Sequence, residues 1–152
     1  MECLFCESSF LNAVFAESQN FMAAYNLAPI LPGHALIVPK NHIESILDLS
    51  DDDLSEMMIF SRKITNLLLT AFKAEAFDWS IQDQEAAGQT ISHMHMHIVP
   101  RIKGDLKDPG DWYPKINENY KVLLDSNKRE KLSNEEIKRI VSKLRDLFHT
   151  EE

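Results

Sequence analysis

The segment from residue 93 to residue 98 carries three histidines at alternate positions along the chain. If this segment forms a strand, successive side chains point to opposite faces. The three imidazoles then share one face, and the apolar residues between them share the other. The apolar face can pack on a core while the imidazoles line an accessible surface. The histidines are His93, His95 and His97, and they alternate with Met94, Met96 and Ile98.

Three interpretations of this triplet are open from the residues alone. The first is a surface strand that happens to be rich in histidine. The second is a catalytic metal cluster, because imidazoles two residues apart on a strand are good zinc ligands. The third is nucleophilic catalysis by one imidazole, with its neighbours serving as phosphate ligands and as a general acid.

A second group of reactive side chains lies at Cys3 and Cys6, in a Cys-x-x-Cys spacing. A structural disulfide is not expected in a reducing compartment. A redox pair of the thioredoxin type would lie between a strand and a helix, and no strand is predicted before Cys3. Two ordinary reduced thiols are therefore the simplest interpretation of these residues taken alone.

The elements that must position these groups begin with short strands. Residues 13–17 and 21–26 are predicted strands separated by a polar turn, and residues 34–38 form a third strand that ends at a proline. Ser50 is followed by three aspartates, which is typical of a helix start. Apolar residues then recur near a 3.6-residue period, so an amphipathic helix is predicted up to about Lys73.

The second half of the chain continues with strands and ends in a helix. Residues 77–82 and 92–99 are predicted strands, and the polar residues 83–89 form the loop between them. Residues 104–119 have the glycine and proline content of a loop. A capping box at residues 133–136 opens an amphipathic C-terminal helix.

This order of strands, helix, strands and helix predicts an α+β fold with a mainly antiparallel sheet, one long central helix and a C-terminal helix. A chain of 152 residues fits a single domain, in which residues 105–152 form the loop and the C-terminal helix.

The net charge and the hydropathy of the chain bear on its partners and its location. The net charge of −8 argues against nucleic acid or an anionic membrane as the main partner, because such binders need an electropositive surface. No run of about 18 apolar residues predicts a membrane span. The first residues lack the basic region and apolar core of a signal peptide, so a cytoplasmic location is expected.

The residues around the triplet resemble the histidine-triad (HIT) superfamily, and within it the branch of fragile-histidine-triad dinucleoside polyphosphate hydrolases. Upstream, Asn26 and the Pro32-Gly33-His34 segment that opens a strand are similar to the nucleotide-binding half of that branch. Downstream, Gly104-Asp105 and the loop aromatic Tyr113 also fit it. Beside the triplet itself, the resemblance is carried by Gln82-Asp83, Gly88-Gln89-Thr90-Ile91-Ser92 and Pro100-Arg101.

The resemblance implies a role for two of the triplet histidines and for one upstream histidine. His95 would be the nucleophile, because a neutral imidazole attacks phosphorus and leaves well from a phosphoramidate. His97 would bind the phosphate and help protonate the leaving oxygen. His34 is placed to orient the triad, and a partly buried loop histidine is the alternative interpretation.

The resemblance also implies a set of substrate-binding residues. Asn26 would bind the ribose hydroxyls, and Phe5 with strand aliphatics would sandwich the base. For Gln82, an exposed amide at the end of a strand is the alternative interpretation. The phosphate oxygens, where charge builds in the transition state, would be bound by Gln82, Gln89, Thr90 and His97. Gly88 and Ile91 complete the implied substrate-binding set.

The resemblance implies a second interpretation of the cysteine pair, as metal ligands. Some bacterial relatives and the related uridylyltransferases carry a Cys-x-x-Cys at this position together with a histidine that follows a proline. His42 matches that histidine, and His93 would supply the fourth ligand beside Cys3 and Cys6. A Cys₂His₂ set suits a structural zinc and not the activation of water. No organic cofactor is expected.

The implied function is hydrolysis of dinucleoside polyphosphates, or of related nucleoside α-phosphate conjugates, through a nucleotidyl adduct of His95. The family further implies a homodimer in which both protomers contribute strands to one continuous sheet. The sequence departs from the hydrolase branch at Gln84-Glu85, where that branch has a Gly-Pro pair. Two alternatives therefore stay open: a nucleotidyltransferase or phosphorylase of the same superfamily, and a nucleotide-binding sensor with slow turnover.

Overall fold

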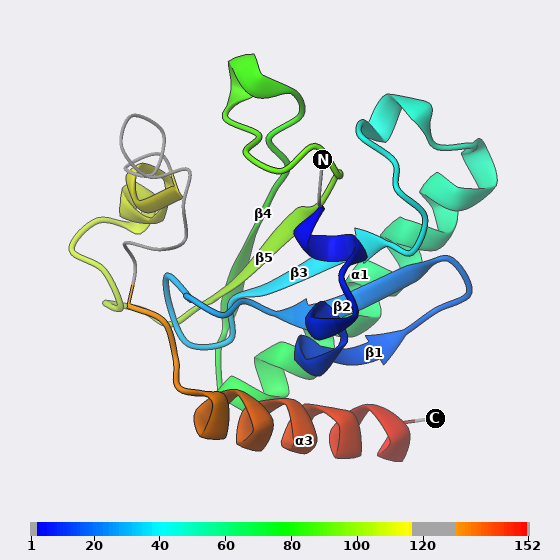
Figure 1. The fold of residues 1–152 in the computed structure, drawn as a ribbon. Helices are drawn as coiled ribbons and strands as arrows, with labels where there is room; N and C mark the ends of the chain where they lie inside the picture. Colours follow the sequence, from blue (N-terminus) through cyan, green and yellow to red (C-terminus); the bar gives the residue numbers. More distant parts are fainter. Residues whose placement is uncertain (1–2, 117–129, 152) are drawn as a thin grey trace.

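The computed structural model describes residues 3–116 and 130–151, and its centre is a five-stranded antiparallel sheet (Figure 1). The predicted α+β fold is confirmed, with every strand pair antiparallel. The strand order is β1-β2-β3-β5-β4, so β1 and β4 lie at the two edges. The strands are β1 (Val14–Glu17), β2 (Phe21–Tyr25), β3 (Ala35–Pro39), β4 (Ala76–Ser80) and β5 (Met96–Arg101).

Helix α1 (Asp51–Phe72) covers one face of the sheet and agrees with the predicted helix. The Ser50 hydroxyl accepts a hydrogen bond from the Asp53 amide and caps its N-terminus. Lys73 ends it in the left-handed conformation, with φ of 53°. The apolar stripe of α1 packs on the sheet in a core that includes Met57, Ile64, Leu67, Leu68, Met96 and Ile98.

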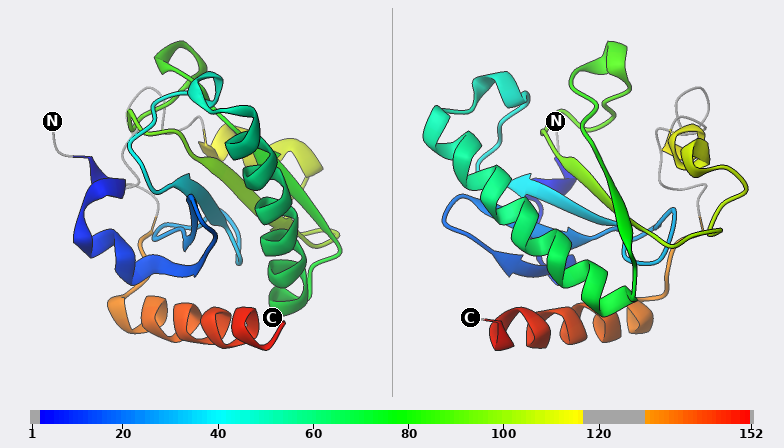
Figure 2. Two further views of the ribbon diagram at one scale, coloured as in Figure 1. Left: turned by 90° about the vertical axis from the view of Figure 1, so that its right-hand side faces the viewer. Right: turned by 180° about the vertical axis from the view of Figure 1, so that it is seen from behind.

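The opposite face of the sheet is covered by the N-terminal segment, as the edge-on view in Figure 2 shows. The sequence analysis missed its two 3₁₀ turns, η1 (Leu4–Cys6) and η2 (Ser8–Ala13), because these turns are too short to show a periodic apolar pattern. Phe5 and Phe10 from the turns pack with Leu36 and Val38 of β3 in a second, smaller core.

Helix α3 (Asn134–Thr150) lies across the edge of the sheet, against β1 and α1 (Figure 1). The predicted capping box is present, since the Ser133 hydroxyl and the Glu136 carboxylate each accept a hydrogen bond from the other residue's amide. The predicted apolar stripe is buried at Ile137, Val141, Leu144 and Phe148. Within the described residues, no helix combines the length and apolarity needed to span a membrane.

The prediction of a strand over residues 92–99 is wrong at both ends, because β5 runs from Met96 to Arg101. Before Met96 the backbone bonds elsewhere: the Met94 amide donates to the Ile43 carbonyl, at 2.7 Å. Ile98 pairs with Ala35, the first residue of β3, so the residues of β5 after Ile98 pair only with β4. A proline is tolerated at position 100 because β3 no longer pairs with β5 there, so no carbonyl of β3 requires a backbone N–H donor.

The segment predicted as a loop over 104–119 contains short helical turns in its described part. These are η5 (Pro109–Asp111) and a helical stretch at residues 112–116, whereas residues 117–119 lie outside the described residues. Arg101 anchors this segment by donating to both carboxylate oxygens of Asp105, at 2.7 and 2.9 Å, and to the Pro109 carbonyl. The Arg101 guanidinium holds the pKa of Asp105 at about 2, so this ion pair persists at neutral pH.

Candidate active site and metal cluster

The three triplet histidines point to the face of the sheet that the N-terminal segment covers, and the residues between them point to α1. Met94, Met96 and Ile98 are buried in the core beneath α1. The predicted alternation therefore holds, although only His97 lies within β5. The histidines nevertheless separate into two groups: His95 and His97 line a cavity, whereas His93 turns toward the cysteines.

One nitrogen of His95 is engaged by the backbone, and this determines what the ring can do. Its Nδ1 lies 3.0 Å from the His93 carbonyl oxygen, so Nδ1–H donates to that carbonyl and the lone pair stays on Nε2. Burial, the largest influence, lowers the pKa of His95, and the His93 carbonyl partly opposes this shift. The ring is therefore neutral at neutral pH and carries a nucleophilic nitrogen.

His97 is oriented by a buried hydrogen-bonded pair with His34. The Ile30 amide donates to Nδ1 of His34, at 3.1 Å, so the proton of His34 resides on Nε2. This Nε2 lies 2.8 Å from Nδ1 of His97 and donates to it. His97 consequently keeps its own proton on Nε2, where it can be given to a substrate oxygen. His34 is fully buried, so the pair is shielded from solvent.

The polar part of the cavity wall brings together most of the residues predicted to bind substrate. Asn26 and Gln82, each 8% exposed, line the cavity beside His95 and His97. The Asn26 carbonyl oxygen accepts from the Ala28 amide, and the Gln82 amide donates to the Ser80 hydroxyl. Gln82 is thus not an exposed amide at a strand end. From the loop after β4, the cavity is lined by Gly88, Thr90 and Ile91.

Gln89 is the predicted phosphate ligand that the structure does not bring to the cavity. Its side-chain oxygen accepts from the Gln84 amide at 2.6 Å, and its nitrogen donates to the Glu44 carbonyl at 3.0 Å. Beside it, the Asp83 carboxylate accepts from the Ile46 amide at 2.8 Å. These contacts tie the loop of residues 83–92 to the segment that follows β3, and so fix the position of its cavity-lining residues.

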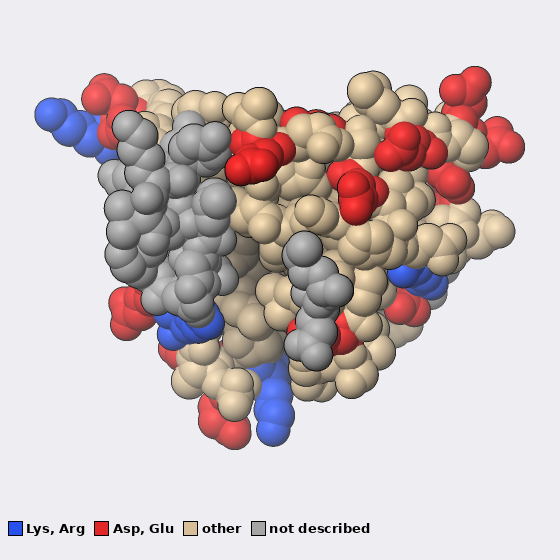
Figure 3. Space-filling view, turned by 45° about the horizontal axis from the view of Figure 1, so that its top comes forward, with Lys and Arg blue, Asp and Glu red and all other residues tan. Residues whose placement is uncertain are grey.

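The rest of the cavity wall is apolar, and most of it escaped the sequence analysis. Leu36 lies on the face of β3 beside His97, to which it is paired in register, and the alternation of that strand could have identified it. Figure 3 shows acidic side chains along the edge of the face above the sheet, with mostly uncharged residues between them. No lysine or arginine lines the described wall, whose apolar and aromatic members are Leu4, Phe5, Phe10, Tyr25, Leu27, Leu36 and Ile116.

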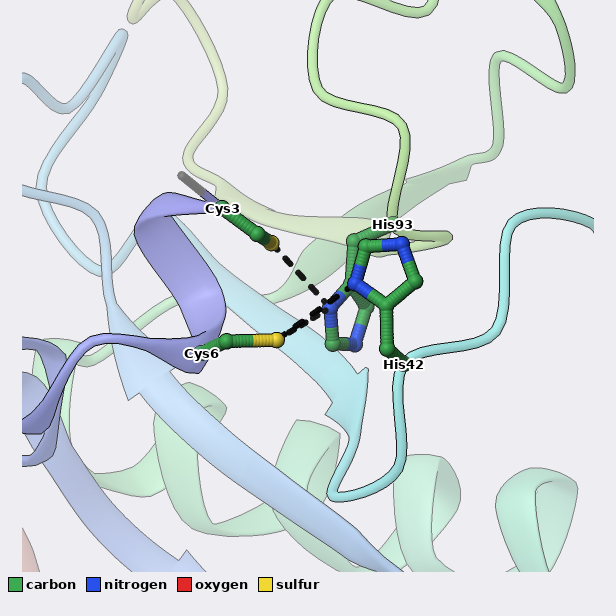
Figure 4. A group of neighbouring side chains, drawn as sticks. All are labelled: Cys3, Cys6, His42 and His93. Atoms are coloured by element: carbon green, nitrogen blue, oxygen red, sulfur yellow. Dashed lines mark hydrogen bonds between the residues drawn. The ribbon is translucent and has the colours of Figure 1, made fainter. Parts of the chain in front are cut away.

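The second group of side chains is the metal cluster, which we define as Cys3, Cys6, His42 and His93 (Figure 4). Nδ1 of His93 lies 3.4 Å from the Cys3 sulfur and 3.6 Å from the Cys6 sulfur. Nδ1 of His42 lies 3.4 Å from the Cys6 sulfur. Tetrahedral zinc places a sulfur and a nitrogen ligand about 3.6 Å apart. The three distances are close to this value, and all four ligand atoms lie within 4.8 Å of one another, so these side chains could hold a metal ion.

The ring nitrogen of His93 that donates a hydrogen bond to the backbone is the opposite one from that of His95. Its Nε2–H donates to the Pro39 carbonyl, at 2.9 Å, which leaves the lone pair of Nδ1 facing both sulfurs. A hydrogen bond of this kind on the remote nitrogen is the usual support of a metal-bound histidine. Burial lowers the pKa of His93, so the ring is neutral and able to coordinate.

The chain is similar to known proteins over most of its length. Residues 10–104 match the family model described as HIT domain. The chain is 32% identical over 135 residues to the bis(5'-adenosyl)-triphosphatase of Dictyostelium discoideum, covering 89% of this chain and 85% of that protein. It is 36% identical over 106 residues to the asymmetrical bis(5'-nucleosyl)-tetraphosphatase of Schizosaccharomyces pombe, covering 70% of this chain and 58% of that protein.

A solved structure leads to the same family. The crystal structure of the C. elegans NitFhit protein superposes with a TM-score of 0.71 at 25% identity, covering 90% of this chain and 27% of that one. The segment that matches the family model contains the triplet, α1 and the three strands that line the cavity, β2, β3 and β5. With its histidine triplet, its antiparallel sheet and these relatives, the chain belongs to the HIT domain family.

Proposed function

We propose that this protein hydrolyses dinucleoside polyphosphates through a covalent nucleotidyl adduct on His95. The observation that carries the proposal is the buried, neutral His95 ring, whose Nδ1–H is held by a backbone carbonyl and whose Nε2 is left as a nucleophile in the cavity. The substrate class is supported by the relatives, which are named as a bis(5'-adenosyl)-triphosphatase and a bis(5'-nucleosyl)-tetraphosphatase.

The reaction consists of two in-line displacements at the α-phosphorus. In the first, Nε2 of His95 forms a bond to phosphorus, and the bond from phosphorus to the bridging oxygen breaks. His97 donates its Nε2 proton to the departing nucleotide, and His34 holds the orientation that makes this transfer productive. In the second, water attacks the same phosphorus and gives one proton to Nε2 of His97, which restores the proton that His97 lost in the first step. The bond from phosphorus to His95 breaks, which restores the free imidazole and releases a nucleoside monophosphate.

Among the described residues, the cavity wall supplies the remaining interactions without a lysine or arginine. Gln82 and Thr90 offer uncharged donors to the phosphate oxygens, and such donors stabilise developing charge without reorganisation. Gly88 and Ile91 shape the wall beside them, and the Gly88 amide donates to the Glu85 carbonyl. Asn26 serves the ribose hydroxyls. The base would lie against the apolar part of the wall, where Phe5 provides an aromatic surface.

The proposal is tested by incubating the protein with diadenosine triphosphate in ¹⁸O-labelled water, with and without inorganic phosphate. We expect AMP and ADP in equal amounts, with one ¹⁸O atom in the AMP and no effect of added phosphate. Formation of ADP alone when phosphate is present would identify a phosphorylase. Tight binding of the substrate without any product would identify a nucleotide-binding sensor.

We also propose that the metal cluster holds one structural zinc ion. Two thiolates and two neutral imidazoles complete a tetrahedron and leave no open position for water or substrate. When bound, the zinc would crosslink the N-terminal turn to the segments that carry His42 and His93. A cytoplasmic location would keep the two free thiols reduced and able to bind it.

We propose a homodimer that extends the sheet across β4. Strand β4 is an edge strand, and Ala76 and Phe77 on it are exposed, Phe77 at 46%. An exposed edge with an aromatic side chain is a ready template for pairing with a second copy. Sedimentation equilibrium should give twice the monomer mass of 17.5 kDa, and a proline at position 78, within β4, should shift the equilibrium toward monomer.

A further inference from the structure

The turn η1 links the metal cluster to the wall of the nucleotide cavity. Cys3 and Cys6 flank the two residues Leu4 and Phe5, and both of these line the cavity. Figure 4 shows the two thiols projecting from this one turn toward the imidazoles of His42 and His93. Any ligand that holds both cysteines therefore also holds two residues of the cavity wall.

Phe5 contacts one triplet histidine of the metal cluster and one that lines the cavity. Its ring meets the His93 ring edge-on at a centroid distance of 5.5 Å and the His95 ring at 5.1 Å. It is 6% exposed and packs against Phe10 at 4.9 Å. The Phe5 ring thus contacts both the His93 imidazole of the metal cluster and the His95 imidazole of the cavity. A shift of η1 would change both contacts.

The polar contacts of η1 are few. Its backbone hydrogen bonds are local, from the Cys6 amide to the Cys3 carbonyl and from the Glu7 amide to the Leu4 carbonyl. Among the described residues, its hydrogen bonds to the rest of the fold come from the two thiols, at 3.4 to 3.6 Å. Thiols are weak donors, so protonated cysteines restrain the turn far less than coordination to a metal would.

We propose that zinc binding at the metal cluster and nucleotide binding in the cavity are thermodynamically coupled through η1, with Phe5 as the positioning residue. Zinc displaces the two thiol protons to solvent and fixes the turn. The fixed turn holds the Phe5 ring in place, both as a surface for the base and as a support for His95. The inference rests on the proposed nucleotide site and assigns the metal cluster a role in substrate affinity.

Coupling of this kind is reciprocal, and this makes it measurable. If zinc tightens nucleotide binding by some factor, the nucleotide must tighten zinc binding by the same factor. Couplings between two sites are commonly between about 5-fold and 150-fold. We expect a coupling factor of at least about 5-fold here. The reason is that the nucleotide then binds to a cavity wall that zinc has already ordered.

The experiment uses AMP, which the protein does not consume, and Zn²⁺ alone. Calorimetry gives the AMP dissociation constant for zinc-loaded protein and for reduced, chelator-treated protein. Competition with a chromogenic chelator gives the zinc dissociation constant with and without saturating AMP. We expect the two factors to agree and to exceed about 5-fold.

Two variants make the test specific. Phe5→Leu keeps all four zinc ligands, so it should bind zinc without AMP as the unaltered protein does and lose the effect of AMP on zinc affinity. Leu11→Ala changes a half-exposed residue of η2 that does not line the cavity, and it should keep the full coupling. The competition starts from zinc-loaded protein and compares each variant with and without AMP, so metal-free protein does not have to be isolated.

The possible results separate this inference from the proposed function. Equal AMP affinity with and without zinc, or an undiminished AMP effect on zinc affinity in Phe5→Leu, would overturn the coupling and leave the proposed function standing. Absence of zinc binding at the cluster would also overturn it. If the zinc-loaded protein binds no AMP, the proposed nucleotide site fails and the coupling fails with it.

Discussion

His93 and His95 lie two residues apart on the same face of the chain, yet they present opposite nitrogens to their surroundings. His95 donates Nδ1–H to a carbonyl of its own segment and keeps the lone pair of Nε2 for the cavity. His93 donates Nε2–H to the Pro39 carbonyl of β3 and keeps the lone pair of Nδ1 for the cysteines. The residue type is the same in both regions, and the carbonyl that accepts the proton decides which ring nitrogen keeps its lone pair for the surroundings.

Replacing His95 should give the largest effect on catalysis and should leave the metal cluster unchanged. We expect His95→Asn to lower kcat by at least about 10³-fold, because it removes an interaction made only in the transition state. AMP affinity and zinc content should stay close to those of the unaltered protein. Turnover of diadenosine triphosphate measures the loss, and His149→Asn, in the last turn of α3, serves as the control. A kcat within tenfold of the unaltered value would remove His95 from the mechanism.

Changing the orientation of His97 should cost less. In His34→Gln the buried donor to Nδ1 of His97 is lost or displaced, so the proton can move between the two nitrogens of His97. We expect kcat to fall by up to about 10²-fold, the lower range for a general acid, with little change in KM. The melting temperature of the variant checks that the fold is kept. A change confined to KM would show that His34 acts on binding and not on proton transfer.

Removing the metal should affect the other region. Cys3→Ser combined with Cys6→Ser should abolish zinc binding, measured by elemental analysis, and lower the melting temperature, because metal-binding energy contributes to folding. The nucleophile is untouched, so kcat at saturating substrate should fall less than about tenfold while KM rises. A loss as large as that of His95→Asn would show that the two regions cannot be separated.

The smallest effect is expected at Gln89. Gln89→Leu removes two hydrogen bonds, one to Gln84 within the loop and one that ties the loop to Glu44. Each bond contributes about 1 kcal/mol, and the Asp83 contacts remain, so kcat/KM should fall about tenfold or less. Gln82→Leu, which removes a cavity-lining amide, should cost more. Equal losses in the two variants would mean that the Gln89 side chain reaches the substrate, as the family resemblance implies.

The elements with a local cause were predictable from the amino-acid sequence. Ser50 and the aspartates after it begin α1, and Ser133 with Glu136 begins α3, because a cap involves residues within one turn of the helix. The face to which each triplet side chain points was also predictable, because alternation along an extended chain depends only on backbone geometry.

The division of that face between two sites depends on contacts between distant segments of the chain and was not predictable. Strand β5 begins at Met96, and not before, because the Met94 amide bonds to Ile43, which is far away in sequence. His93 is turned to the cysteines by a carbonyl of β3, and the Gln89 amide is held away from the cavity by the segment after β3. These contacts join residues between 45 and 54 positions apart. Local patterns carry no information about such pairs, because only the packed chain brings them within hydrogen-bond distance.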